Sequence, residues 1–434
     1  MRLIFQGGMR IRPARSFRGR FVLPGDKSIT HRAFLFGALA NGISTVEGAS
    51  TGDDCASTRR CLETLGTRFE DGGSTIRIHG GHPLVQPDAP LDCGNSGTTL
   101  RLLMGVLAAS GPAGPRIDAT LSGDDSLKQR PMERVARPLR AMGARIETSS
   151  GFPPVRVVGS GLCGASLSPE AASAQIKSAI LLAALNAEGT TTVHETVPTR
   201  DHTERMIGLF GGRIRVFDRE IEIDGPQSLS PARVRVPGDP SSAAPFILAA
   251  LILDDSEVTI DNVLLNPHRI RYVHVLREMG ADITIEPESS PDAEPRGRIV
   301  ARSSELRSVA ISPHDIPALI DELPLLAVAG AYAQGRLEVR GASELRVKES
   351  DRIRSMVEGL SSMGARIEET EDGFSVEGGG LGGGSVQSHG DHRIAMALAI
   401  AALGAQGDTD VAGAEVVSIS LPTFFAELNR GASR

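Results

Sequence analysis

The sequence predicts an α/β protein of two similar domains, each built from three copies of one supersecondary unit. Two patterns predict this fold. In the first, a short polar cluster leads into an Ala-, Leu- and Ile-rich segment six times along the chain. In the second, an amphipathic segment ends at a glycine and is followed by residues that alternate between apolar and polar. A regular period of this kind indicates repeated structural units.

The six apolar segments are expected to be helices buried inside the domains. In chain order they are "KSITHRAFLFGALA", "GNSGTTLRLLMGVLAAS", "SAQIKSAILLAAL", "DPSSAAPFILAALIL", "DELPLLAVAGAYA" and "DHRIAMALAIAALG". Their anchor residues are Ser28, Ser96, Ser173, Ser241, Asp321 and Asp391, at intervals of 68, 77, 68, 80 and 70 residues. A helix that is apolar on all sides is buried. We call the polar cluster before each segment its polar leader.

The second series predicts the outer layer of sheets and amphipathic helices. Its glycines lie in "LGTRF", "MGARI", "FGGRI", "MGADI" and "MGARI", after patterns such as "MERVARPLRAMG". Glycine suits the left-handed residue that ends a helix, and the alternation after it suits a half-buried hairpin. A sixth glycine is expected near residue 430, where Gly431 stands. The hairpin that would follow it is expected in residues 1–24, which predicts one domain of residues 25–236 and another of residues 1–24 and 237–434.

Composition argues against several classes of function. The net charge is −7, so nothing global indicates a nucleic-acid or anionic-membrane partner. The longest apolar stretches are shorter than the ~18 residues of a membrane span, and residues 1–16 lack the pattern of a secretory signal. The cysteines show no metal-binding spacing; they are Cys55, Cys61, Cys93 and Cys163. We therefore expect a cytoplasmic protein with reduced thiols and no metal.

The polar leaders carry cations at predicted helix starts. In "PGDKSITHR", Lys27 and Arg32 flank a helix that Asp26 or Ser28 caps. Free N–H groups at a helix start favour anions, and buried cations need anionic partners. A surface helix with solvated charges is the alternative for this stretch alone. If the six polar leaders converge, they form an anion-binding cleft in an acidic protein.

Seven motifs in order give the chain a strong resemblance to a known family. They are "PGDKSITHRA", "GNSGTTLR", "LKQRP", "SAQIKSA", "VPGDPSSAA", "RVKESDR" and "DHRIAMA". The chain resembles the 5-enolpyruvylshikimate-3-phosphate synthases. This resemblance implies two domains of three βαβαββ units each, which close on the substrates when shikimate 3-phosphate binds. It also implies transfer of the enolpyruvyl group of phosphoenolpyruvate to the 5-hydroxyl of shikimate 3-phosphate by a monomer, without a metal or another cofactor.

The resemblance also implies roles for individual residues. The implied catalytic residues are Lys27, Asp321, Glu349 and His392, with Asp321 as proton acceptor at the 5-hydroxyl and Glu349 as the group that shuttles the C3 proton. The implied shikimate 3-phosphate ligands are Lys27, Ser28, Arg32, Ser173, Gln175, Arg200, Asp321 and Lys348. The implied phosphoenolpyruvate ligands are Lys27, Asn95, Gly97, Arg130, Gln175, Arg352 and Arg393. The inhibitor glyphosate is expected in the same place as phosphoenolpyruvate, with Gly97 leaving room for it.

Three positions depart from the family pattern, and two other functions stay open. Ala174 stands where many members have a phosphate-binding serine, Glu344 replaces a common asparagine, and Ile419 replaces a lysine. Arg200 is expected to compensate for Ala174. The first alternative is enolpyruvyl transfer to UDP-N-acetylglucosamine, although the loop "SLKQRP" lacks the cysteine acid of that family. The second is a phosphate-ligand binding protein without catalysis, although Lys27, Asp321 and Glu349 are all present.

Overall fold

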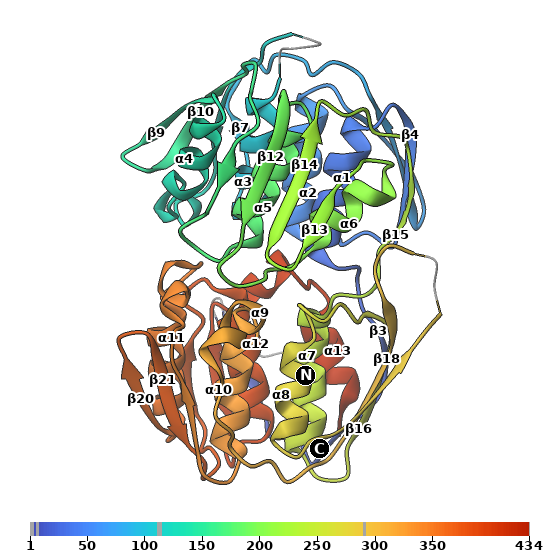
Figure 1. Ribbon diagram of the computed structural model, residues 1–434. Helices are drawn as coiled ribbons and strands as arrows, with labels where there is room; N and C mark the ends of the chain where they lie inside the picture. Colours follow the sequence, from blue (N-terminus) through green and yellow to red (C-terminus); the bar gives the residue numbers. More distant parts are fainter. Residues whose placement is uncertain (1–3, 6–7, 111–114, 290–291, 434) are drawn as a thin grey trace. The chain divides into compact units, whose positions relative to one another are not determined.

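The protein forms two compact units. The computed structural model describes residues 4–5, 8–110, 115–289 and 292–433. Unit 1 comprises Met1–Pro24, Pro237–Ser290 and Pro295–Arg434, and unit 2 comprises Gly25–Val236 and Pro291–Glu294 (Figure 1). The sequence had assigned residues 291–294 to the other domain. They belong to unit 2 because Glu294 is buried there in a hydrogen bond with His202.

Unit 2 contains three four-stranded sheets with one topology. The strand orders are β15-β4-β6-β5, β7-β8-β10-β9 and β11-β12-β14-β13. In each sheet the first two strands are parallel and the other neighbours are antiparallel. The strands are β4 Gly42–Glu47, β5 Arg68–Gly72, β6 Thr75–Gly80, β7 Leu91–Asp92, β8 Asp118–Ser122, β9 Arg145–Ser149, β10 Phe152–Val158, β11 Ser166–Leu167, β12 Gly189–His194, β13 Arg215–Phe217, β14 Glu220–Gly225 and β15 Arg233–Arg235.

Two kinds of helix alternate in unit 2. The apolar helices are α1 Lys27–Leu39, α3 Gly97–Ala108 and α5 Ala174–Ala184, and α3 packs against both of the others. The amphipathic helices are α2 Asp53–Thr64, α4 Glu133–Ala141 and α6 His202–Leu209, with a 3-10 turn, η1, at Leu127–Gln129. The second repeat runs β7-α3-β8-α4-β9-β10, the third runs β11-α5-β12-α6-β13-β14, and β15 supplies the first strand of the first repeat. The predicted βαβαββ unit is confirmed.

Unit 1 repeats the plan less regularly. Its sheets have the orders β17-β18-β16-β3-β24, β19-β21-β20 and β1-β2-β23-β22. The strands are β1 Ile4–Phe5, β2 Gly8–Ile11, β3 Ser16–Val22, β16 Glu257–Leu264, β17 Asp282–Pro287, β18 Arg296–Arg302, β19 Arg336–Val339, β20 Arg366–Thr370, β21 Gly373–Glu377, β22 Gly384–Gln387, β23 Thr409–Ala412 and β24 Ala432–Ser433. Strand β3 pairs in parallel with β16, and β2 pairs antiparallel to β23. Residues before Pro24 thus supply strands to two repeats of unit 1.

The helices of unit 1 follow the same division. The apolar helices are α7 Pro240–Ile252, α10 Leu323–Tyr332 and α12 His392–Leu403, which pack against one another. The others are α8 Arg271–Glu278, α9 Ile316–Leu319, α11 Arg352–Ser362 and α13 Phe424–Gly431, with 3-10 turns η2 Pro313–Asp315, η3 Ser343–Val347 and η4 Ala414–Ile419. Every residue of α12 is buried, as expected of a helix without a polar face.

The predicted helix-ending glycines adopt the expected conformation. Their φ angles lie between 77° and 100° at Gly66, Gly143, Gly211, Gly280 and Gly364. Gly431 differs, because it is the last residue of α13 and its φ is not in the left-handed region. No helix in the described part of the chain has the length and apolarity that a membrane crossing needs.

Candidate active site

The residues expected to form the site fall into two groups, one in each unit. In unit 2 they lie at the starts of α1, α3 and α5 and in the segments before α4 and α6. In unit 1 they lie at the starts of α10, α11 and α12. The starts of α1, α3, α5, α10 and α12 are polar leaders of the apolar segments. The residues before α4, α6 and α11 precede the other helices of the repeat.

Lys27 is held at the start of α1 by a carboxylate from α2. Asp26 caps α1, because its Oδ1 accepts a hydrogen bond from the Ile29 N–H at 2.8 Å, so the cap is Asp26 and not Ser28. The Lys27 Nζ lies 2.8 Å from Oδ2 of Asp54, and both side chains are mostly buried. The sequence reasoning missed Asp54. Its only signal was an acidic residue in the first turn of a helix, which is common in helices of every function.

Arg32 is buried and joins three helices. Its Nε donates to Thr203 Oγ1 at 2.7 Å, its Nη2 donates to Ser178 Oγ at 2.6 Å, and its Nη1 donates to the Ser28 carbonyl at 2.9 Å. Burial lowers the pKa of Arg32 to about 10, although Glu204 and Asp26 oppose that shift. The guanidinium is therefore still charged at neutral pH. A buried cation of this kind favours an anion brought to its remaining N–H donors.

Asn95 and Arg130 meet beside the start of α3. The Arg130 Nη2 donates to Asn95 Oδ1 at 2.7 Å, and the Asn95 Nδ2 donates to Asp124 Oδ2 at 2.6 Å. Ser96 caps the helix by accepting a hydrogen bond from the Thr99 N–H at 3.1 Å. The structure therefore brings together Asn95 of "GNSGTTLR" and Arg130 of "LKQRP", two of the expected ligands.

Gly97 is the first residue of α3 and is flanked by two arginines. A Cβ at this position would lie 3.0 Å from Arg101 Nη1 and 3.3 Å from Arg130 Nη1. Arg101 in turn donates to Gln175 Oε1 at 2.5 Å, and the Gln175 Nε2 donates to Thr98 Oγ1 at 2.8 Å. Arg101 is the last residue of the motif "GNSGTTLR" and is not among the expected ligands. Two guanidinium groups at the start of a helix form an arrangement suited to a phosphate or carboxylate.

The third repeat of unit 2 contributes Ser173 and Arg200 to the expected site. Ser173 is the N-terminal cap residue of α5, yet its side chain makes no capping hydrogen bond, and it is half-buried. Arg200 precedes α6 in a loop that is held firmly. The Thr199 N–H donates to Glu195 Oε1 at 3.1 Å, and Lys177 pairs with Glu195 at 3.0 Å and with Glu204 at 2.6 Å. Lys177 therefore has a structural role in fixing this loop.

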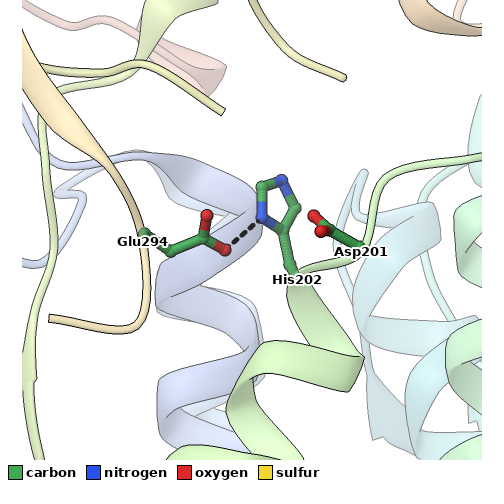
Figure 2. Close-up of side chains that lie close together, drawn as sticks. All are labelled: Asp201, His202 and Glu294. Carbon is green, nitrogen blue, oxygen red and sulfur yellow. Dashed lines mark hydrogen bonds and ion pairs between the residues drawn. The ribbon is translucent and has the colours of Figure 1, made fainter. Parts of the chain in front are cut away.

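A second set of ion pairs fixes the residues after Arg200. Figure 2 shows His202 between Asp201 and Glu294, with its Nδ1 2.6 Å from Glu294 Oε1. Among the described residues this is the group of three whose ligand atoms lie close enough, within 4.8 Å, to hold a metal ion. However, the Arg205 Nε lies 2.8 Å from Asp201 Oδ2 and 3.7 Å from Glu294 Oε2. The Arg205 guanidinium thus pairs with both carboxylates, and the group anchors the start of α6.

In unit 1, one buried arginine contacts both expected proton-transfer carboxylates. The Arg352 Nη2 lies 2.6 Å from Glu349 Oε2, its Nη1 lies 3.6 Å from Asp321 Oδ1, and its Nε lies 2.8 Å from Asp391 Oδ2. Arg352 is only 2% exposed. Burial disfavours its charge, but Asp391, Glu349 and Asp321 outweigh burial and raise the pKa of the guanidinium. Asp391, which the sequence reasoning did not place in the site, completes this cluster.

Arg393 lies in a neighbouring buried network. Its Nη1 lies 3.9 Å from Glu322 Oε1 and 3.5 Å from the Ser241 carbonyl oxygen. The Ser241 hydroxyl donates to Glu322 and accepts from Arg269 Nη2 at 3.1 Å. The polar leaders of α7, α10 and α12 therefore share one hydrogen-bonded network.

Two further expected residues have simpler surroundings. The Lys348 Nζ lies 3.3 Å from Glu344 Oε1, so the residue that departs from the family pattern is an ion-pair partner of the expected ligand. His392 is buried at the first position of α12. Ala174 is the first residue of α5, and Ile419 is the last residue of η4.

Comparison with known proteins decides the family. A family model described as EPSP synthase (3-phosphoshikimate 1-carboxyvinyltransferase) matches residues 11–428. The chain belongs to the EPSP synthase family. A 3-phosphoshikimate 1-carboxyvinyltransferase of Thermoanaerobacter sp. is 45% identical over 420 residues, which cover 96% of this chain and 98% of the relative. One from Geobacillus kaustophilus is 46% identical over 420 residues, which cover 95% of this chain and 97% of the relative.

Solved structures agree with this membership. The structure of EPSP synthase from Acinetobacter baumannii has a TM-score of 0.86 and 41% identity, and covers 98% of each chain. The enolpyruvyl transferase NikO from Streptomyces tendae has a TM-score of 0.76 at 19% identity, covers 98% of this chain and 97% of its own, and shares the fold. The predicted fold class and family are confirmed, and members of the EPSP synthase family are transferases. The roles of individual residues stay predictions.

Proposed function

We propose that this chain transfers the enolpyruvyl group of phosphoenolpyruvate to the 5-hydroxyl of shikimate 3-phosphate and releases phosphate. The observation that carries the proposal is the approach of Arg101 and Arg130 to Gly97 at the start of α3. Both substrates carry a phosphate and a carboxylate, and bidentate guanidinium groups bind such anions well. Full-length similarity to 3-phosphoshikimate 1-carboxyvinyltransferases supports the same choice of substrates.

The unit 2 residues bind and orient the substrates. Lys27, Asn95, Gly97 and Arg130 hold phosphoenolpyruvate, and Arg101 joins them through its position beside Gly97. Shikimate 3-phosphate is held by Ser28 and Arg32 of α1, by Ser173 and Gln175 at α5, and by Arg200. Because Arg101 is hydrogen-bonded to Gln175, the two substrate positions are mechanically linked. Holding two substrates in the right orientation supplies a large part of the rate enhancement of a two-substrate reaction.

The unit 1 residues bind substrate and move protons, with Lys27 of unit 2 contributing as well. Lys348, Arg352 and Arg393 bind substrate anions. In the addition step, Asp321 accepts the proton of the 5-hydroxyl while the hydroxyl oxygen bonds to C2 of phosphoenolpyruvate. The C2–C3 double bond opens as Glu349, in its protonated form, donates its proton to C3. The product is a tetrahedral ketal that still carries the phosphate. In the elimination step, Glu349 takes a proton from C3 as the C2–O bond to phosphate breaks, which leaves the enolpyruvyl ether and free phosphate. Contacts of Asp321 and Glu349 with Arg352 support this pairing of roles, since both carboxylates are positioned by one rigid group.

The test is phosphate release from phosphoenolpyruvate with each acceptor in turn. We expect release that depends on shikimate 3-phosphate and none with UDP-N-acetylglucosamine. Release with the nucleotide sugar only would replace this proposal with the sister reaction. Binding of shikimate 3-phosphate without phosphate release would replace it with a non-catalytic binding protein. A cytoplasmic location and a monomeric state stay predictions.

A further inference from the structure

His31 is a buried histidine of the first polar leader that the proposed reaction does not use. It lies on α1, one helical turn after Lys27, and its side chain is fully enclosed. Burial, together with the charges of Lys27 and Arg32, lowers the pKa of His31 well below its usual value. The imidazole is therefore neutral at physiological pH, and its hydrogen-bonding role depends on which ring nitrogen carries the hydrogen.

A continuous chain of hydrogen bonds runs from His31 to the start of α3. The His31 Nδ1 lies 2.7 Å from Thr58 Oγ1, which lies 2.6 Å from Thr99 Oγ1, which lies 2.7 Å from Ser96 Oγ. Each of the four residues is at most 1% exposed. The chain thus joins α1 to α2 and α2 to the cap of α3 in an environment closed to bulk water.

The hydrogen count fixes the direction of this chain. The Thr99 hydroxyl donates its one hydrogen to Ser96 Oγ, and the other acceptor in its reach is the Asp54 carbonyl oxygen at 3.3 Å. With either acceptor, Thr99 Oγ1 must accept the hydrogen of the Thr58 hydroxyl. Thr58 Oγ1 then accepts from His31, so the hydrogen is on Nδ1. Nε2 is left as a bare lone pair, consistent with its having no hydrogen-bond partner among the described residues.

Each linked residue lies on the same helix as a residue of the proposed site or its ion-pair partner. His31 follows Lys27 by four residues and Thr58 follows Asp54 by four, so each pair lies on one face of its helix. Thr99 is two residues after Gly97. A shift of α1, α2 or α3 along its axis would leave a buried donor or acceptor unpaired, which is costly in a closed environment.

We propose that His31, Thr58 and Thr99 are positioning residues that hold the helix starts bearing Lys27, Asp54 and Gly97 in the register that phosphoenolpyruvate requires. This inference rests on the proposed function. The chain does not include α5, which carries Gln175 and begins after Ser173. On α1, Arg32 is held separately by Thr203 and Ser178. Loss of the chain should therefore weaken the use of phosphoenolpyruvate much more than the affinity for shikimate 3-phosphate.

The test compares Thr58→Val, which removes the hydroxyl at nearly constant shape, with Thr58→Ser, which keeps it. We expect Thr58→Val to lower kcat/KM for phosphoenolpyruvate about tenfold, mainly through KM, while Thr58→Ser stays within about threefold of wild type. Calorimetric Kd values for shikimate 3-phosphate should agree within about twofold. Thr191→Val is the matched control, because Thr191 is also fully buried in unit 2 and its hydroxyl has no hydrogen-bond partner among the described residues.

Two results would overturn the proposal. One is a Thr58→Val enzyme that matches Thr191→Val. The other is an equal loss for both substrates, which a general structural role would produce. Nitrogen NMR of ¹⁵N-histidine-labelled protein tests the geometry independently of turnover, with the His31 signal assigned by its absence in His31→Asn. A wild-type His31 protonated at Nε2 would refute the chain. Absence of turnover by the wild type with a neutral Nδ1–H tautomer would refute only the proposed function.

Discussion

The two units cap their three apolar helices with different chemistry. In unit 2 the cap residues of α1, α3 and α5 are Asp26, Ser96 and Ser173. In unit 1 the corresponding residues of α7, α10 and α12 are Asp239, Glu322 and Asp391, all acidic. The difference lies at α3 and α5, because α1 of unit 2 is also capped by a carboxylate, that of Asp26. A neutral cap leaves the positive end of a helix available to an anion, whereas a carboxylate neutralises it. The same fold thus presents two different electrostatic surfaces.

The arginines of the two units also differ in the partners that they contact. In unit 2, Arg101 and Arg130 donate to the neutral amides of Gln175 and Asn95. In unit 1, Arg352 contacts three carboxylates, and Arg269 contacts Asp239 at 3.1 Å. In unit 2, Lys27 resembles the unit 1 arginines in this respect, because it pairs with the carboxylate of Asp54. The carboxylates around Arg352 are held in place by its guanidinium group. We therefore expect anion binding mainly from unit 2 and proton transfer mainly from unit 1.

Removal of the proton-transfer groups of unit 1 should have the largest effect. Asp321→Asn and Glu349→Gln keep the size of each side chain but cannot accept a proton, so turnover should fall about 10²–10⁴-fold. Calorimetry should still detect shikimate 3-phosphate binding to both variants. Either variant with near-wild-type turnover would remove its residue from the chemistry and weaken the division between the units.

Giving α5 of unit 2 an acidic cap like those of unit 1 should raise the stability of the protein and weaken substrate binding. Ser173→Asp supplies the capping hydrogen bond that Ser173 does not make, so the free energy of unfolding should rise by about 1 kcal/mol. The new charge should repel the substrate phosphate and raise the Kd for shikimate 3-phosphate about a hundredfold. Ser173→Asn, a neutral cap of the same size, is the control. Equal Kd values for the two variants would place Ser173 away from the phosphate.

A smaller change at Gly97 tests whether unit 2 depends on open space between its arginines. The added Cβ in Gly97→Ala would crowd Arg101 and Arg130 at 3.0 and 3.3 Å, so both guanidinium groups must move slightly. We expect competitive inhibition by glyphosate against phosphoenolpyruvate in the wild type, weakened about tenfold in the variant, with a smaller rise in KM. Gly161→Ala, where a Cβ meets no atom within 4 Å, should match wild type. Unchanged inhibition in Gly97→Ala would show that Gly97 does not line the inhibitor site.

The neutral His31 of unit 2 predicts the smallest effect, a pH dependence of stability. Because the pKa of His31 is lowered in the folded protein, the unfolded chain binds a proton near pH 6.5 that the folded protein resists. Stability is therefore highest above pH 6.5 and falls on acidification, by at most about 1.4 kcal/mol per pH unit from this group. His31→Asn keeps a side-chain N–H donor and cannot titrate. Its denaturation midpoint should fall less than that of wild type between pH 7.5 and pH 5.5, and parallel curves would contradict the assignment.

The features that could be predicted from the sequence are those that a local residue pattern determines. The apolar segments, their polar leaders and the glycines from Gly66 to Gly364 are set by neighbours within one helix or turn, so periodicity reveals them. The supply of N-terminal strands to unit 1 is partly predictable from the sequence. The sixth repeat lacks a hairpin after its glycine, and residues 1–24 belong to no other repeat. The first strand of the first repeat, β15 at Arg233–Arg235, gave no such signal because only three residues form it.

The site depended on contacts that local pattern does not reveal. Asp54 pairs with Lys27 across 27 residues, and Arg101 pairs with Gln175 across 74. The third carboxylate at Arg352 comes from Asp391, 39 residues away. Motif resemblance gave a role to one member of each of these contacts. Arg101 and Asp391 stand in the quoted motifs without a role, and Asp54 has only an ordinary sequence context. Which charged residues come into contact depends on how the repeats pack, and the local sequence does not contain that information.

The pairing of β2 with β23 has a consequence for biosynthesis. Met9 of β2 lies opposite Val411, so this strand emerges from the ribosome about 400 residues before its partner. At roughly 5–20 residues per second, translation leaves it unpaired for about 20–80 seconds. Residues 25–236, by contrast, contain their own β15 and can complete three sheets while later codons are still being read. The order of synthesis therefore favours unit 2 as the first to fold, with unit 1 closing only as the last strands leave the exit tunnel.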